Sequence, residues 1–189
     1  SDYAEIKAPL GATLIHLAEP AEIFSVESNR EAHLSLVSST VSSLLRQRWS
    51  HVIYGSSVAV YGDTEMYPRR PDEVVSPKDL YSIGKLLCEK LVLDSGGTVI
   101  RLSNIFGSSA SRPNIFMDLI RQLNKNGPVY VRNSAPERDF LWVDDVARGF
   151  LMVAMQPSSG IYNMASGRTV SIAHLARVLL HEAGQLERP

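Results

Sequence analysis

Short apolar runs and longer segments of helical spacing alternate along the first hundred residues, and this alternation is the strongest constraint on the fold. The apolar runs are ATLIHL at 12–17, HVIYGS at 51–56 and TVIRLS at 98–103. The segments between them, 29–48 and 76–97, repeat apolar residues with the period of a helix. Strands that alternate with helices are typical of a parallel sheet covered by helices. We therefore expect an α/β fold.

The sequence after residue 103 mixes short strands and helices without the same regular order. Helices are expected at 115–127, 145–156 and 171–184, strands at 128–131 and 160–166, and a loop at 104–114. This change in the order of the elements predicts a division into a core at 1–103 and a smaller lobe at 104–189, and some segments of the lobe are expected to return to the core.

The composition excludes several classes of protein. The 189 residues include 19 Lys and Arg against 20 Asp and Glu, a net charge of -1, so the chain lacks the basic stripe typical of nucleic-acid binding. No apolar run approaches the ~18 residues of a membrane-spanning helix, and no basic-then-apolar leader opens the chain. Cys88 is the only cysteine, which excludes an internal disulfide and favours a reduced, cytoplasmic setting.

Ser57, Tyr81 and Lys85 are the strongest chemical signal. Ser57 ends the second apolar run, and Tyr81 and Lys85 lie four apart at the start of a predicted helix, so they share one helix face. Half-ionising a phenol near pH 7 takes ~3 pKa units, or about 4 kcal/mol. One positive charge ~4 Å away supplies about that much at an effective dielectric of ~20. Such a phenolate can take a proton from a sugar hydroxyl as hydride leaves the carbon, while a serine holds the oxygen.

The alternative interpretation of Tyr81 and Lys85 is an ordinary surface pair, because the spacing Y-x-x-x-K arises often by chance. The strand-terminal serine 24 residues before Tyr81 favours the catalytic interpretation over the accidental one.

Five ordered motifs resemble one family. SSVAVYGD, YSIGK, RLSNIFG, RDFLWVDDVA and GIYNMASG resemble, in order and spacing, the extended short-chain dehydrogenase/reductases, the nucleotide-sugar epimerase and dehydratase family whose members include UDP-glucose 4-epimerases. The resemblance covers nearly the whole chain from LIHLAE onward. It implies a Rossmann-type doubly wound parallel sheet with a small α/β substrate-binding lobe. It also implies a catalytic triad of Ser57, Tyr81 and Lys85.

The resemblance further implies that NAD is the cofactor, with NADP as the alternative. Tyr81 and Lys85 would contact it, Lys85 at the nicotinamide ribose. His16, Leu17 and Ala18 match the family's His-Leu-Ala-Ala turn beside the cofactor, although a histidine at a strand end is more often structural. Asn29 matches an asparagine at the start of the next helix, where it could equally be only a helix cap.

Asn104 and Arg138 are the substrate-binding residues that the resemblance implies, together with Ser57. Asn104 matches the asparagine of R-x-x-N-x-x-G, which touches the sugar or its phosphates, and Arg138 matches an arginine that grips a nucleotide diphosphate. Without the resemblance, Arg138 and Asp139 would be a surface ion pair. Asn163 is expected to organise a turn. No metal site is expected, since HEAGQ at 181–185 lacks a second histidine.

Two departures from the family pattern narrow the function. Dehydratases usually carry Thr-Asp-Glu where this chain has SSVAV, which favours an epimerase or ketoreductase. The chain also contains no G-x-G-x-x-G turn between a strand and a helix, the element that holds the pyrophosphate. That element would precede Ser1, and relatives also continue past Pro189.

In the doubly wound strand order 3-2-1-4-5-6, the apolar run at 12–17 would be strand 4, normally flanked by strand 1. Without strands 1 to 3 it would lie at the edge of the sheet, which native proteins cover. The expected cover is a separate N-terminal segment, a second copy of the chain, or an edge rebuilt from residues 1–10.

Three hypotheses for the function follow. The first is an NAD-dependent nucleotide-sugar epimerase or ketoreductase, whose substrate is a nucleotide-diphosphate sugar and which could form a homodimer. The second is a truncated, non-catalytic family member that serves as a binding or assembly module. The third is a reductase of small ketones or aldehydes. Neither nucleic acid nor a membrane is an expected partner in any of them.

Overall fold

A computed structural model describes residues 6–18, 30–62, 68–107 and 114–188 of the protein. The chain divides into two compact units. Unit 1 comprises residues 1–102 and 147–164, and unit 2 comprises residues 103–146 and 165–189. A segment of the second half of the chain therefore belongs to the first unit.

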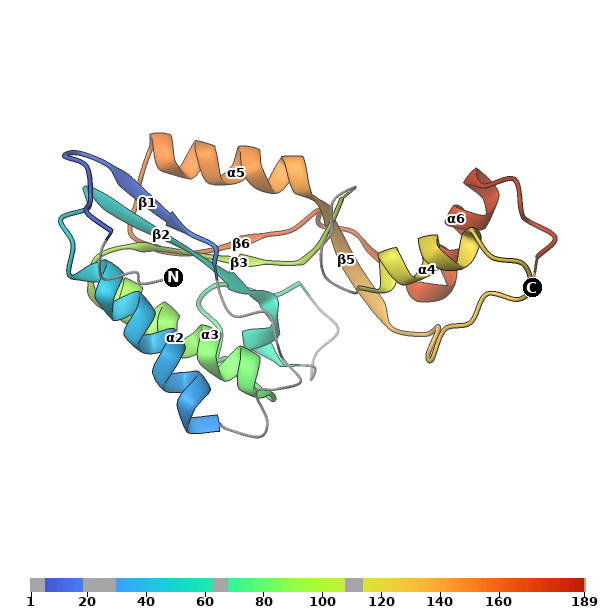
Figure 1. Cartoon of the computed structure of the whole chain (residues 1–189), viewed down its shortest axis with the longest axis horizontal. Helices are drawn as coiled ribbons and strands as arrows, with labels where there is room; N and C mark the ends of the chain where they lie inside the picture. Colours follow the sequence, from blue (N-terminus) through green and yellow to red (C-terminus); the bar gives the residue numbers. More distant parts are fainter. Residues whose placement is uncertain (1–5, 19–29, 63–67, 108–113, 189) are drawn as a thin grey trace. The chain divides into compact units, whose positions relative to one another are not determined.

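In the described part of unit 1, four parallel strands form a sheet in the order β1-β2-β3-β6. The strands are β1 (Thr13–His16), β2 (His51–Ser57), β3 (Thr98–Leu102) and β6 (Gly160–Met164). The helices α2 (Arg30–Leu45) and α3 (Leu80–Asp94) lie on one face, and α5 (Val143–Met155) lies on the other (Figure 1). A parallel sheet with helices on both faces is the α/β fold expected from the alternation of segments, and it agrees with the Rossmann-type sheet that the family resemblance implied.

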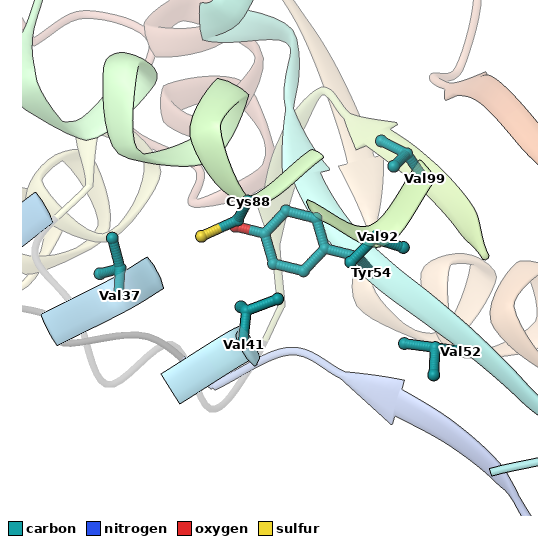
Figure 2. Close-up of a cluster of buried hydrophobic side chains, with 7 residues drawn as sticks. All are labelled: Val37, Val41, Val52, Tyr54, Cys88, Val92 and Val99. Atoms are coloured by element: carbon teal, nitrogen blue, oxygen red, sulfur yellow. The ribbon is translucent and has the colours of Figure 1, made fainter. Parts of the chain in front are cut away.

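The core of unit 1 lies between the sheet and the helices α2 and α3. Tyr54 is fully buried at its centre, and the side chains of Val37 and Val41 on α2 and of Cys88 on α3 lie around it (Figure 2). Burial of each such apolar side chain contributes about 1.5–3 kcal/mol relative to exposure. Cys88 is buried here as a small hydrophobic residue and forms no disulfide.

The buried face of α2 is formed by residues one helical turn apart. Val37, Val41 and Leu44 are buried, at i, i+4 and i+7, whereas Leu36 is 52% exposed. The β-branched valines rather than the neighbouring leucine therefore meet the sheet.

Among the described residues β1 pairs only with β2, which makes it the edge strand of the sheet. Thr13, Leu14 and Ile15 are half-buried and His16 is buried. Residues 6–12 form no strand beside β1, so within the described residues the chain does not rebuild this edge itself.

The described residues of unit 2 form three strands and two helices. The strands are β4 (Asn104–Phe106), β5 (Glu137–Trp142) and β7 (Thr169–Ser171), and the helices are α4 (Ile115–Leu123) and α6 (Ile172–Glu182). β5 is central, parallel to β4 and antiparallel to β7.

Two sequence predictions in unit 2 are wrong. Residues 104–106 were expected in a loop, but they form β4 because Phe106 packs against Phe116, Phe140 and Trp142. Residues 128–131 were expected to form a strand and do not. The Gln122 side chain instead bonds the backbone N–H and carbonyl of Tyr130, at 2.7 and 2.9 Å, and so satisfies groups that a strand would have paired.

Candidate active site

Ser57, Tyr81 and Lys85 all lie in unit 1, at the end of β2 and the start of α3. Ser57 is the last residue of β2, and its hydroxyl accepts a 3.2 Å hydrogen bond from the Ala59 N–H as the cap of a short 3-10 helix, η3 (Val58–Tyr61). α3 begins at a capping box in which the Asp79 carboxylate accepts from the Ser82 N–H at 2.7 Å and the Ser82 hydroxyl accepts from the Asp79 N–H. This cap fixes where the helix starts, and so places Tyr81 in its first turn.

Lys85 is almost completely buried, with 6% of its surface exposed. Its ammonium donates a 2.7 Å hydrogen bond to the carbonyl oxygen of Gly55. The same ammonium lies 4.9 Å from the ring centroid of Tyr54 and 5.7 Å from that of Tyr81. The positive charge is thus held between a strand carbonyl and two aromatic rings, one of which is the predicted base.

A buried ion pair lies one helical turn beyond Lys85. Glu89 of α3 and Arg101 of β3 are 1% and 2% exposed, and their closest oxygen and nitrogen are 2.7 Å apart. The Ser56 hydroxyl also donates to Glu89, at 2.5 Å. Burial lowers and the hydrogen bond to Glu89 raises the pKa of Arg101, with a net rise above its ordinary value.

Glu89 was not singled out from the sequence, although a signal for it exists. Tyr81, Lys85 and Glu89 follow one another at intervals of four residues, which puts all three on one face of α3. An acidic residue on the sheet-facing side of a helix needs a buried partner, and the arginine of the RLSN motif is that partner.

Tyr61 links the segment after Ser57 to β6. Its hydroxyl donates a 2.6 Å hydrogen bond to Asn163, and the Asn163 amide donates to the carbonyl of Arg69. The guanidinium carbons of Arg101 and Arg69 lie 4.7 and 5.6 Å from the Tyr61 ring centroid. Asn163 was expected to organise a turn; it instead joins β6 to the loop that follows η3.

The residues expected beside the cofactor lie at the end of β1. His16 is 5% exposed, and its ring stacks on that of Tyr54 with centroids 5.8 Å apart. Leu17 and Ala18 follow and are exposed; the Leu17 side chain lies close to Gly55, where an added Cβ would meet it at 2.8 Å. Asn29 lies outside the described residues.

The two expected substrate-binding residues lie in unit 2. Asn104 and Arg138 are both exposed, on β4 and β5. The Asn104 amide donates a 3.1 Å hydrogen bond to the carbonyl oxygen of Asp139, the residue after Arg138. The Arg138 guanidinium donates to the Glu137 carbonyl at 3.0 Å.

Asp139 organises the turn that the sequence analysis assigned to Asn163. Its carboxylate accepts hydrogen bonds from the backbone N–H groups of Ser166, Gly167 and Arg168 and from the Ser166 hydroxyl. Burial raises the pKa of Asp139, but the hydrogen bonds from Ser166 and Gly167 outweigh it and hold the pKa below its ordinary value. Within the described residues the Asp139 carboxylate thus bonds the turn at 166–168, whereas the guanidinium of Arg138 bonds the carbonyl of Glu137.

Two kinds of feature are not found in the part of the chain that the structure describes. No group of three or more His, Cys, Asp or Glu residues there could hold a metal ion. No helix there is long and apolar enough to cross a membrane.

Comparisons with known proteins identify one family and several similar proteins. The model of the NAD dependent epimerase/dehydratase family matches residues 11–165. A putative UDP-glucose 4-epimerase of Methanocaldococcus jannaschii is 27% identical over 145 residues, which are 70% of this chain and 47% of that protein. A probable polysaccharide biosynthesis protein, EpsC, of Bacillus subtilis is 28% identical over 120 residues, 60% of this chain and 20% of that protein. The chain thus matches half or less of the length of these curated relatives.

Solved structures share the fold. RMD from Pseudomonas aeruginosa, complexed with NADPH, superposes with a TM-score of 0.88 at 23% identity, over 96% of this chain and 70% of the other. The UDP-glucose 4-epimerase of Thermotoga maritima, with UDP-glucose, superposes with a TM-score of 0.79 at 20% identity, over 94% and 62%. At these identities the likeness concerns the fold.

Proposed function

The chain belongs to the NAD dependent epimerase/dehydratase family, and from that membership we propose that Ser57, Tyr81 and Lys85 act in hydride transfer on a nucleotide-diphosphate sugar. The reaction would be that of an epimerase or a ketoreductase. The single observation that carries the proposal is the buried ammonium of Lys85, 5.7 Å from the ring centroid of Tyr81. A positive charge at that distance favours the phenolate form of the tyrosine.

The three side chains have complementary roles. Tyr81 would take the proton from the sugar hydroxyl, and the Ser57 hydroxyl would hold that oxygen through a hydrogen bond. Lys85 would stabilise the phenolate and bind the ribose of the nicotinamide. Its hydrogen bond to Gly55 holds the ammonium in place, so the charge needs no rearrangement when the proton moves.

The donor set fits one end of the cofactor. A buried ammonium next to a phenol, with the His16 ring stacked on Tyr54 close by, is suited to the nicotinamide and its ribose. A bound NAD would supply the hydride acceptor. Within the 189 residues no glycine-rich turn is present for the pyrophosphate. The residues of this chain that would contact NAD are therefore Tyr81, Lys85 and those around His16.

Arg138 and Asn104 support the assignment of a nucleotide-diphosphate sugar as the substrate. An exposed arginine with a planar fork of donors suits a diphosphate. Among the solved relatives, the epimerase of Thermotoga maritima is a complex with UDP-glucose, and the protein MoeE5 has been solved with UDP-glucose and NAD. In this chain both residues belong to unit 2.

Thermal unfolding of the chain with NAD or NADH, up to millimolar concentration, tests the proposal. A ligand at 100 times its Kd adds about 2.7 kcal/mol of stability, which raises the Tm of a chain of this size by roughly 5–10 °C. Lys85→Met should abolish the shift. Lys90→Met, the same substitution at an exposed position of α3, should preserve it. A folded chain whose Tm does not respond to either nucleotide contradicts the proposal and supports the non-catalytic binding or assembly module.

A further inference from the structure

We propose that Glu89 is a positioning residue, which fixes α3 against β2 and β3 and thereby sets the place of the Lys85 ammonium beside Tyr81. The catalytic consequence of this role rests on the proposed function. The contacts by which Glu89 holds α3 do not depend on it. Glu89 is 1% exposed and lies one helical turn after Lys85. Its carboxylate accepts from the Ser56 hydroxyl at 2.5 Å and from Arg101 Nη2 and Nε at 2.7 and 3.0 Å.

The two partners of Glu89 are themselves a register pair. Ser56 on β2 lies opposite Arg101 on β3 in the parallel ladder. One carboxylate on α3 is therefore bonded to both members of a cross-strand pair. A helix bonded to one strand can still swing about that contact, whereas a helix bonded to two neighbouring strands at the same level cannot.

The Glu89 contacts are adjacent to the one that Lys85 makes. Lys85 donates to the carbonyl of Gly55, and Glu89 accepts from Ser56, the next residue of β2. Two successive turns of α3 are thus bonded to two successive residues of β2, and Ser57 is the third. A displacement of α3 along the strand would tilt both bonds away from their donor–acceptor lines, and a hydrogen bond weakens steeply as its angle departs from linear.

Hydrophobic packing alone does not supply this precision. The valines and Cys88 between α3 and the sheet are held by a non-directional effect, so small slides cost little. Hydrogen bonds to charged groups are short and directional. A buried ion pair adds little net stability compared with apolar residues of the same size, so a purely stabilising role explains this polar group poorly, and a positioning role explains it.

Glu89→Asp in the full chain tests the proposal, because aspartate keeps the buried charge opposite Arg101 but is one methylene too short to reach both partners. We expect the carbonyl ¹³C resonance of Gly55 to move upfield, as the hydrogen bond from Lys85 weakens. We also expect the phenol of Tyr81 to ionise at a higher pH, measured by NMR on ¹³Cζ-labelled tyrosine and assigned through Tyr81→Phe. If Glu89 contributes only to global stability, the substitution should lower the unfolding free energy and leave both resonances of the folded chain unchanged.

Glu73→Asp is the matched control. Glu73 also pairs with an arginine, Arg69, at 2.6 Å, but it lies outside α3, so neither readout should change. If Glu89→Asp does not fold, Ser56→Ala replaces it, since it removes only the bond to β2; the same two shifts are expected. An unchanged Gly55 resonance in the folded variant overturns the positioning role.

The Gly55 resonance separates failure of this proposal from failure of the proposed function. If Tyr81 of the unaltered chain ionises together with the other tyrosines, the proposed base is contradicted. The Gly55 carbonyl still decides whether Glu89 positions Lys85, because that bond exists with or without catalysis.

Discussion

The ammonium of Lys85 donates a 2.7 Å hydrogen bond to the carbonyl oxygen of Gly55, two residues before Ser57. This bond ties the helix that carries the predicted base to the strand that carries the predicted serine. It also accounts for a lysine that is only 6% exposed, since a buried charge requires a partner. The candidate active site is thus part of the core packing of unit 1 rather than an addition to its surface.

Lys85→Met should move the ionisation of the Tyr81 phenol to higher pH. The Lys85 ammonium lies 5.7 Å from the ring centroid of Tyr81. A unit charge ~6 Å from a phenolate oxygen would contribute about 3 kcal/mol at an effective dielectric of ~20, which corresponds to about two pKa units. The measurement is a pH titration of the chain by NMR on labelled tyrosine. Lys90→Met serves as the control, and a Tyr81 resonance that titrates identically in all three proteins would refute the electrostatic role of Lys85.

Arg138→Ala should weaken binding of a nucleotide-diphosphate sugar such as UDP-glucose. A hydrogen bond to a charged group contributes about 1.5–3 kcal/mol, or roughly a 10- to 150-fold change in Kd. Isothermal titration calorimetry on the variant and on Arg132→Ala, at an exposed arginine six residues earlier in the sequence, checks this. Equal affinity in both variants would argue against a diphosphate substrate and in favour of a small ketone or aldehyde.

The parallel sheet was predictable from the sequence because strands buried on both faces read as continuous apolar runs. All five residues of β2 between His51 and Ser57 are buried, as the apolar run HVIYGS in the sequence predicts. The strands of unit 2 were not predictable in the same way. β4 is three residues long, and its aromatic contacts join residues far apart in sequence.

The candidate site was only partly predictable for a related reason. Ser57, Tyr81 and Lys85 stand at recognisable positions of a strand and a helix. The function of Asp139 depends on a turn 27 residues further along the chain, and that of Glu89 depends on the register between Ser56 and Arg101. The four-residue spacing places Glu89 on the same helix face as Lys85, but its partners, like those of Asp139, come from other segments, and only the structure identifies them.

Asp139→Asn should destabilise the protein in a pH-dependent manner. The pKa of Asp139 is lowered in the folded chain, so its contribution to stability is present above the unfolded value of about 3.9 and is lost as pH falls through the lower folded value. The difference in unfolding free energy between the unaltered chain and the variant should therefore be constant near neutral pH and shrink below about pH 4. Urea unfolding across this range measures it, and a difference that grows on acidification would contradict the assignment.

Two glycine-to-alanine substitutions around α3 should change stability in opposite directions. At Gly97, a Cβ would lie 2.7 Å from the Val52 carbonyl oxygen and 2.6 Å from Val92 Cγ1. Backbone atoms of a central strand cannot withdraw, so Gly97→Ala should cost about 1–3 kcal/mol, as overpacking does. At Gly84, inside α3, the nearest atoms would be at 3.5 Å, an ordinary contact. Gly84→Ala should therefore gain about 0.5–1 kcal/mol from helix propensity.

Guanidinium unfolding of the two variants measures both effects, provided that the unfolding free energy falls with denaturant concentration at the same slope in each. The comparison is informative because the substitution is the same and only the space around the Cβ differs. If Gly84→Ala were as destabilising as Gly97→Ala, α3 would have to lie closer to α2 than the contacts with His33 and Val37 allow. The packing that holds Tyr81 and Lys85 against β2 would then need to be revised.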